Sequence, residues 1–289
     1  MNKLKPLPEE WSGLLNNEQK EAIENINGPL LIIAGAGSGK TRVLTYRYAH
    51  LIKTYGINFE NVLAITFTNK AANEMKDRIS DLLNLELSPK WISTFHSLCV
   101  KMLRIHGHLM GFNNNFTIYD QSDSTNLVRN CMRDSDIDTK QYSPKRIQAH
   151  ISSLKNQRIL PGEAVEFAQS FFDVKVAEIY SSYQKKLMLA NSMDFDDLLI
   201  KAVELLETSD KSLNYWSSKF QYIMIDEYQD TNMVQYRLVE LLASKHKNIC
   251  VVGDSDQSIY AFRGADIRNI EEFESDFKNA KVISLLKKF

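Results

Sequence analysis

The sequence predicts an α/β protein, in which a parallel sheet covered by helices on both faces is interrupted by an all-helical insertion subdomain. Two observations lead to this prediction. Short apolar runs alternate with helical segments over residues 30–105 and again over 220–285, as is typical of a buried parallel sheet. Between these stretches, residues 113–192 show helical apolar spacing and only one short extended piece, Thr117–Tyr119.

The first alternating stretch follows a helix that is capped by Asn16 and Asn17 and closed by Gly28-Pro29. Three strands come next, and each leads into a helix. The expected strands are Leu30–Ile33, Val62–Phe67 and Trp91–Phe95, and the expected helices run from Thr41 to near Gly56, from Lys70 to Asn84 and from His96 to Ile105.

The second alternating stretch resumes this order after the insertion. Its expected elements are a strand Phe220–Asp226, a helix Met233–Leu242, a strand Ile249–Gly253, a helix Asp266–Phe277 and a strand Lys281–Leu285. We therefore expect a split α/β domain, residues 1–112 and 193–289, around a helical subdomain, residues 113–192.

Composition restricts the class of protein. The 289 residues include 35 Lys and Arg against 36 Asp and Glu, a net charge of −1, so the whole-chain field does not attract nucleic acid and a DNA site must be local. Cys99, Cys131 and Cys250 are far apart and form no C-x-x-C pair, which favours reduced thiols over disulfides or zinc. No apolar run reaches the roughly 18 residues of a membrane span. We expect a cytoplasmic protein without a membrane partner.

A glycine-rich loop, Ile32 to Thr41, joins the first strand to its helix and is a candidate phosphate-binding loop. Its glycines let backbone N–H groups turn inward, and the helix N-terminus adds further unpaired N–H groups. Lys40 is expected to reach the β/γ-phosphates of ATP, and the Thr41 hydroxyl a Mg²⁺ ion. Ala34 occupies the slot of the first glycine, so a tight turn between a core strand and a helix stays an alternative. The expected backbone contacts to phosphate come from Ala36, Gly37, Ser38 and Gly39.

Two adjacent carboxylates, Asp226 and Glu227, lie at the end of the expected strand 220–226. In a phosphate-loop nucleotidase, Asp226 would hold Mg²⁺ through water, and Glu227 would orient and deprotonate the attacking water. Carboxylates at strand ends are also common as helix caps. Because Asp226 and Glu227 occur in the same sequence as the glycine-rich loop, we favour the catalytic interpretation.

The turn after the strand Ile249–Gly253 contains Asp254, Asp256 and Gln257. Because the carboxyl ends of parallel strands meet at one edge of a sheet, we expect this turn beside the nucleotide. Gln257 is then a candidate γ-phosphate sensor. Turn chemistry alone is the alternative for the two aspartates.

Aromatic residues interleaved with arginine follow directly in the segment 258–264. Bases of single-stranded nucleic acid stack on aromatic faces whatever their identity, so this composition suits single-stranded DNA. Phe67 and His96 lie where the second and third strands end, so they are further candidates for stacking on bases at this edge of the sheet. For Phe262, packing in the core is the alternative. For the basic residues of the insertion we favour a solvated helical face over a DNA surface; they are Lys140, Lys145, Arg146, Lys155 and Arg158.

Seven segments, in this order, resemble the motifs of the UvrD/Rep/PcrA group of superfamily 1 DNA helicases. They are LNNEQ, AGAGSGKTRVL, ITFTNKAANEMKDR, STFHSLCVKMLR, MDFDDLL, IDEYQDTN and VVGDSDQSIYAFRGAD, between about Leu14 and Val282. The resemblance implies a RecA-like P-loop NTPase sheet, in an enzyme that uses ATP to move 3′ to 5′ along single-stranded DNA.

By position, the resemblance assigns adenine recognition to Gln19 and stacking on adenine to Arg42. It supports the ATP-site roles of Lys40, Thr41, Asp226, Glu227 and Gln257 and assigns DNA-facing positions to Phe67, His96, Tyr260, Phe262 and Arg263. Many relatives have Trp where this chain has Phe262, which offers a smaller stacking face.

The family continues with a second RecA-like domain that supplies arginine fingers, whereas this sequence reads Leu286-Lys287-Lys288-Phe289 and stops. We expect a chain that binds ATP and single-stranded DNA but is nearly inactive alone. Its expected partners are a second RecA-like domain in trans, or proteins of DNA repair or replication. The alternative is a non-catalytic truncated or split protein that binds nucleotide and DNA.

Overall fold

A computed structural model describes residues 4–35, 37–84, 89–254, 273 and 275–285. The chain divides into two compact units. The first comprises Met1–Leu98, Asp210–Asn232 and Val239–Phe289, and the second comprises Cys99–Ser209 and Met233–Leu238. The domain boundaries that we expect from the sequence stay a prediction.

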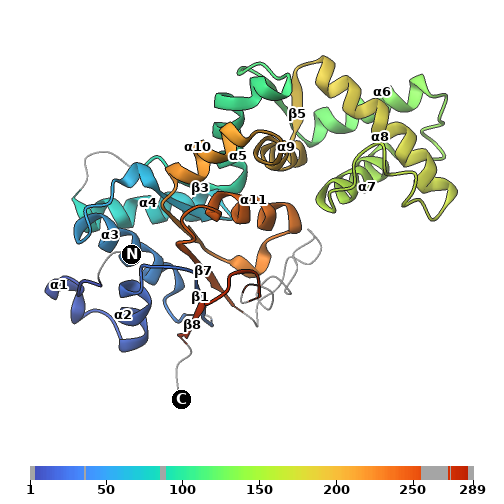
Figure 1. The fold of residues 1–289 in the computed structure, drawn as a ribbon. Helices are drawn as coiled ribbons and strands as arrows, with labels where there is room; N and C mark the ends of the chain where they lie inside the picture. The colour runs from blue at the N-terminus through green and yellow to red at the C-terminus, as the bar shows by residue number, and fades with distance from the viewer. Residues whose placement is uncertain (1–3, 36, 85–88, 255–272, 274, 286–289) are drawn as a thin grey trace. The chain divides into compact units, whose positions relative to one another are not determined.

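The first unit is built on a six-stranded sheet in the order β3-β2-β6-β7-β1-β8, and its strands pair in parallel (Figure 1). The buried strands β2, β6 and β7 form its centre with β1, which confirms the predicted α/β class. The strands are β1 Leu30–Ile33, β2 Val62–Thr66, β3 Ile92–Thr94, β6 Tyr222–Ile225, β7 Ile249–Gly253 and β8 Lys281–Ser284.

Most helix ends lie within one residue of the expected ones, but the helix after β1 ends at Lys53, before the expected end near Gly56. The helices Glu9–Ser12 and Asp210–Lys219 were not expected from the sequence. Asn16 forms a capping box with Gln19, and the helix leaves helical geometry at Asn25, before the expected stop at Gly28. The expected helix 266–277 lies mostly outside the described residues. The helices are α1 Glu9–Ser12, α2 Asn17–Glu24, α3 Lys40–Lys53, α4 Asn69–Leu83, α5 Phe95–His106, α10 Asp210–Lys219 and α11 Met233–Ala243, with short 3₁₀ turns at Phe59–Asn61 (η1) and Tyr228–Asp230 (η3).

The second unit packs its helices around an apolar core that includes Val128, Ile147, Ile151, Val176 and Tyr180. The expected extended piece Thr117–Tyr119 is strand β4, and it pairs in parallel with a second strand, β5 Ser192–Asp194, which the sequence did not indicate. The helices are α6 Gln121–Asp134, α7 Pro144–Asn156, α8 Phe171–Leu189 and α9 Phe195–Thr208, with the 3₁₀ turn η2 at Gly107–Met110.

Lys155 corrects one expectation for this unit. The side chain is 1% exposed, and its Nζ lies 2.7 Å from both Asp194 Oδ2 and Asp197 Oδ1. Burial acts to lower the pKa of Lys155, but the two carboxylates overcome it and the pKa is raised. The prediction that Lys155 lies on a solvated helical face is therefore wrong. The spacing of residues along α7 cannot show that Asp194 of β5 and Asp197 of α9 lie beside this side chain.

Over the described part of the chain, no helix has both the length and the apolar composition to cross a bilayer.

Candidate nucleotide-binding site

The loop between β1 and α3 explains why Ala34 replaces a glycine. Its N–H donates to the carbonyl of Gly253 at 2.9 Å, so Ala34 extends the strand ladder and is fully buried. Among the described residues of the loop, the left-handed positions are Gly37 (φ +72°) and Gly39 (φ +92°), where a side chain is strained. A Cβ on Gly39 would also lie 2.8 Å from Gln19 Nε2. The loop thus needs glycine at its end and tolerates alanine at its start.

The first turn of α3 brings the loop to the carboxylates. Lys40 Nζ lies 3.2 Å from Glu227 Oε2 and 3.6 Å from Asp254 Oδ2. The Thr41 hydroxyl lies 3.4 Å from Asp226 Oδ2, across 185 residues of sequence. These side chains lie close together because β6, β7 and β1 are consecutive in the sheet, with Ile33 of β1 opposite Gly253 of β7.

Asp226 and Glu227 differ in environment although they are adjacent. Asp226 is 4% exposed, and burial, followed by the charge of Glu227, raises its pKa to about 6. Glu227 has φ +51°, a left-handed backbone uncommon outside glycine, and its side chain is 38% exposed. The sharp turn at Glu227 thus takes the second carboxylate out of the sheet.

Thr41 and Asp226 provide the donors that Mg²⁺ uses beside a nucleotide. This ion is typically held by one or two protein oxygens and keeps phosphate oxygens and waters for its other positions. No group of three or more His, Cys, Asp or Glu side chains suited to a metal occurs among the described residues. Two oxygen ligands, the Thr41 hydroxyl and the Asp226 carboxylate, suit an ion that takes its other ligands from a nucleotide and from water.

Gln19 and Arg42, which the resemblance assigns to adenine, lie near this loop. Gln19 Nε2 donates to the carbonyl of Ser38 at 3.1 Å, and its Oε1 accepts from the N–H of Asn16 at 3.2 Å. The guanidinium of Arg42 lies 6.0 Å from the ring centroid of Tyr46. Gln19 thus contacts the phosphate loop itself, which its spacing in sequence did not reveal.

Phe67 and His96 follow β2 and β3, which pair in parallel and end together at the edge that holds the nucleotide groups. The Phe67 ring meets the buried ring of Phe95 edge-on, with centroids 5.7 Å apart. The other predicted contacts, Ala36, Gln257, Tyr260, Phe262 and Arg263, lie outside the described residues.

Gln229 and Asp230 belong to the site but were not singled out from the sequence. Gln229 is 1% exposed and contacts both Glu227 and the backbone of Asp254. Burial, followed by the charge of Glu227, raises the pKa of Asp230 to about 6. The only available signal was their place in the IDEYQDTN segment.

Comparison with known proteins confirms the family resemblance of the sequence. The model of the UvrD/REP helicase N-terminal domain matches residues 15–278. The ATP-dependent DNA helicases PcrA of Staphylococcus epidermidis and Staphylococcus aureus are each 49% identical over 271 residues, which is 94% of this chain and 37% of the relative. The chain thus spans little more than a third of the length of these relatives.

Proposed function

The chain belongs to the UvrD/REP helicase family, and from this premise we propose that it is the ATP-binding and single-stranded-DNA-binding N-terminal part of a 3′–5′ DNA helicase. The observation that supports this most strongly is the meeting of Lys40 and Thr41 with Glu227 and Asp226 at one sheet edge. A flexible cation, a hydroxyl and two carboxylates of different exposure are the groups that phosphoryl transfer to water requires.

In this proposal Lys40 exchanges its carboxylate partners for the β/γ-phosphates, to which it makes charge-assisted contacts. Thr41 and Asp226 hold Mg²⁺, which neutralises phosphate charge when it is bound. Glu227 orients a water molecule and takes its proton, as its exposed position allows. Gln257 senses the γ-phosphate, and Gln19 and Arg42 hold the adenine.

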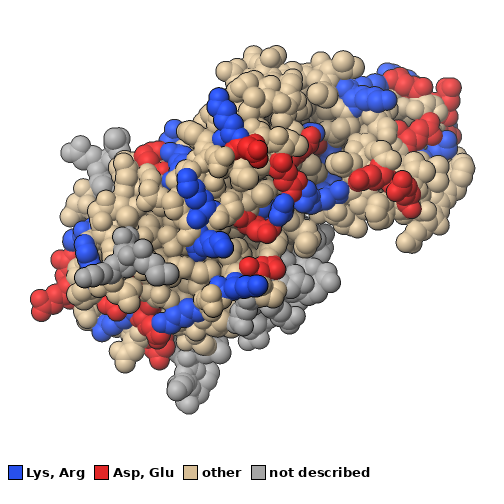
Figure 2. Space-filling model, viewed as in Figure 1, with Lys and Arg blue, Asp and Glu red and all other residues tan. Residues whose placement is uncertain are grey.

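Single-stranded DNA is proposed to lie along the ends of β2 and β3. On the face shown in Figure 2, basic and acidic side chains are interspersed, and the net charge of the chain is −1. In this proposal affinity depends on stacking at Phe67, His96, Tyr260 and Phe262, with Arg263 on a phosphate. Such binding tolerates any base sequence.

The nucleotide site is tested by calorimetry with Mg-ATP. We expect Lys40→Ala to lower affinity by at least about 10-fold, since hydrogen bonds between charged groups contribute roughly 1.5–3 kcal/mol. Lys53→Ala is the matched control, because Lys53 lies on the same helix and pairs with Glu10 at the surface. Unchanged affinity in a folded Lys40→Ala protein would contradict the proposal.

The DNA site is tested by fluorescence anisotropy with single-stranded and duplex oligonucleotides at fixed salt. We expect Phe67→Ala to weaken single-strand binding by about 5-fold or more, given roughly 1–3 kcal/mol per stacked base. Phe59→Ala is the control, because Phe59 lies in η1 before β2, whereas Phe67 follows the other end of that strand. Equal affinity for duplex DNA would count against the surface. ATP binding without any hydrolysis in the complete protein would favour the non-catalytic alternative.

A further inference from the structure

Gln229 connects two strand ends of the candidate site. Its Nε2 donates to Glu227 Oε2 at 2.8 Å, and its Oε1 accepts from the backbone N–H of Asp254 at 3.0 Å. Gln229 is 1% exposed, so its contact to Asp254 is shielded from water, whereas its contact to Glu227 is partly buried. Gln229 therefore ties the carboxylate after β6 to the backbone after β7.

The backbone fixes the polarity of this link. The N–H of Asp254 can only donate, so it must face the amide oxygen of Gln229. The amide nitrogen is then directed at Glu227 as a donor. Of the residue types of this length, methionine supplies neither contact and glutamate supplies only the acceptor.

Lys40 and Gln229 both contact the same oxygen, Glu227 Oε2. Among the described residues, no hydrogen bond reaches Glu227 Oε1, which leaves this oxygen available to a water molecule. If Lys40 turns to phosphate, as the proposed function requires, Gln229 is the remaining described donor that holds the carboxylate.

We propose that Gln229 is a positioning residue that orients the Glu227 carboxylate for attack by water, an inference that rests on the proposed function. It acts through Glu227 and does not contact the nucleotide. Loss of its hydrogen bond should therefore slow hydrolysis and leave Mg-ATP affinity nearly unchanged.

The test compares Gln229→Met, Gln229→Glu and the unchanged chain. Single-turnover hydrolysis of labelled ATP, with protein in excess, is measured at one fixed pH beside calorimetry with Mg-ATP. We expect Gln229→Met to hydrolyse ATP about 10-fold more slowly, with ATP affinity within about twofold.

Gln229→Glu distinguishes positioning from a structural role. Glutamate keeps the acceptor for the backbone N–H of Asp254 but removes the donor to Glu227. If Gln229 acts by donating to Glu227, Gln229→Glu should hydrolyse ATP no faster than Gln229→Met. Hydrolysis by Gln229→Glu at the rate of the unchanged chain would show that only the link to Asp254 matters, and that result would overturn the proposal.

The matched control is Gln184→Met. Gln184 makes the same kind of contact, from its Nε2 to a carboxylate oxygen of Asp197 at 3.0 Å, within the second unit. We expect a similar loss of stability and no change in hydrolysis. An equal loss of hydrolysis in Gln184→Met would assign the Gln229 effect to general destabilisation.

A second measurement does not depend on turnover. In a double-mutant cycle of Gln229→Met with Glu227→Ala, urea unfolding should show coupling of about threefold or more in the unfolding equilibrium constant. Additive effects would overturn the contact. Absence of Mg-ATP binding by the unchanged chain would instead contradict the proposed function, whereas hydrolysis that needs Glu227 but not Gln229 would contradict this inference alone.

Discussion

Asp226 and Glu227 are adjacent in sequence but are suited to different tasks. Asp226 is buried beside the Thr41 hydroxyl, and its Oδ1 accepts from the N–H of Glu227 at 3.0 Å. The backbone of Glu227 is left-handed and turns the chain away from the strand, and the Glu227 carboxylate contacts Lys40 and Gln229. One carboxylate is placed to hold a cation and the other to act on water.

Substitution of each carboxylate by its amide should separate these roles. Glu227→Gln is expected to bind Mg-ATP normally and to lose hydrolysis by about 10²-fold or more, because an amide cannot take a proton. Asp226→Asn should instead weaken the dependence of ATP binding on Mg²⁺. Calorimetry at varied Mg²⁺ and a single-turnover assay measure both effects. If the two variants lost ATP affinity equally, the separation of roles would be wrong.

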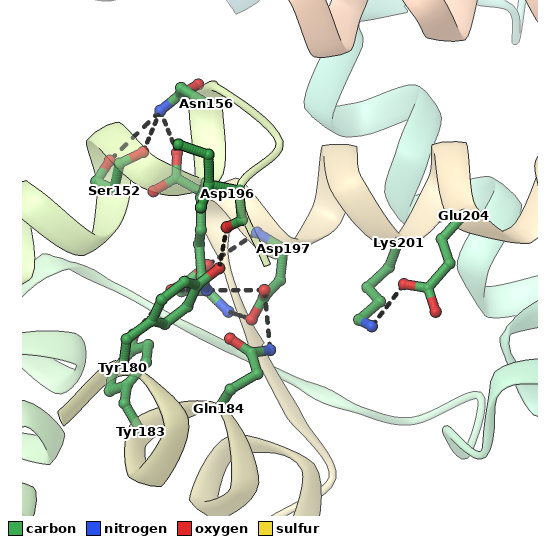
Figure 3. A network of polar contacts seen from close by, with 12 residues as sticks. Ser152, Asn156, Tyr180, Tyr183, Gln184, Asp196, Asp197, Lys201 and Glu204 are labelled. Carbon is green, nitrogen blue, oxygen red and sulfur yellow. Dashed lines mark hydrogen bonds and ion pairs between the residues drawn. The ribbon is translucent and has the colours of Figure 1, made fainter. Parts of the chain in front are cut away.

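At the scale of elements, the start of α9 is held by a buried polar network (Figure 3). Asp194 caps α9 in a capping box with Asp197, and both carboxylates bind Lys155 of α7. From α8, the Tyr183 hydroxyl donates to Asp194 at 2.8 Å, and Gln184 donates to Asp197. The network thus joins α7, α8, β5 and α9, and removal of one buried charge partner typically costs about 3–5 kcal/mol.

Asp196 makes this region sensitive to pH. Burial, followed by the charge of Asp194, raises the pKa of Asp196 from 3.8 to about 6, although Asn156 donates to it at 3.2 Å. A raised carboxyl pKa means that the folded state binds more protons, so stability falls as pH rises from about 4 to 6.

Asp196→Asn should remove this loss. Relative to the unchanged chain, the variant is expected to gain at most about 3 kcal/mol at neutral pH and much less near pH 4, since one pKa unit corresponds to about 1.36 kcal/mol. Urea unfolding at both pH values measures the difference. Glu178→Gln is an exposed control in the same unit. A gain that does not vary with pH would show that Asp196 is not the titrating group.

At the scale of the first unit, one sheet edge holds both sets of proposed groups. The nucleotide groups follow β1, β6 and β7, and the described DNA-facing groups follow β2 and β3. Because β2 and β6 are neighbours, with Ile65 opposite Ile225, the two sets adjoin within one rigid element. This proximity suits a protein in which DNA affects the use of ATP.

The polypeptide of residues 1–289 should hydrolyse ATP slowly by itself. The resemblance places arginine fingers in a second RecA-like domain, and such arginines contribute about 10³ to 10⁵ in rate in related phosphoryl transfers. We expect ATP binding, weak hydrolysis and no measurable strand separation, with hydrolysis raised when a second RecA-like domain is supplied in trans. ATPase and unwinding assays with and without that domain measure this. Robust unwinding by these residues alone would contradict the prediction.

The sequence by itself determined the α/β class and the order along the chain of the six strands of the main sheet, and it identified the candidate phosphate-binding loop. These features depend on local patterns: apolar runs at strand spacing, glycines before Lys40, and carboxylates after an apolar strand. The ends of β7 were predicted correctly for the same reason. Helix ends were less well predicted, because caps such as that of α2 depend on single side-chain contacts.

Only the tertiary structure decided which distant residues meet. The order β3-β2-β6-β7-β1-β8 brings Lys40 to Glu227 and lets Gln229 contact Asp254. Packing within the second unit likewise buries Lys155 between two carboxylates, where spacing along α7 predicted a solvated side chain. The spacing of apolar residues along a helix or strand shows which of its faces is apolar. The partner of each face is selected by packing and hydrogen bonding between segments far apart in the chain, and no local pattern contains that information.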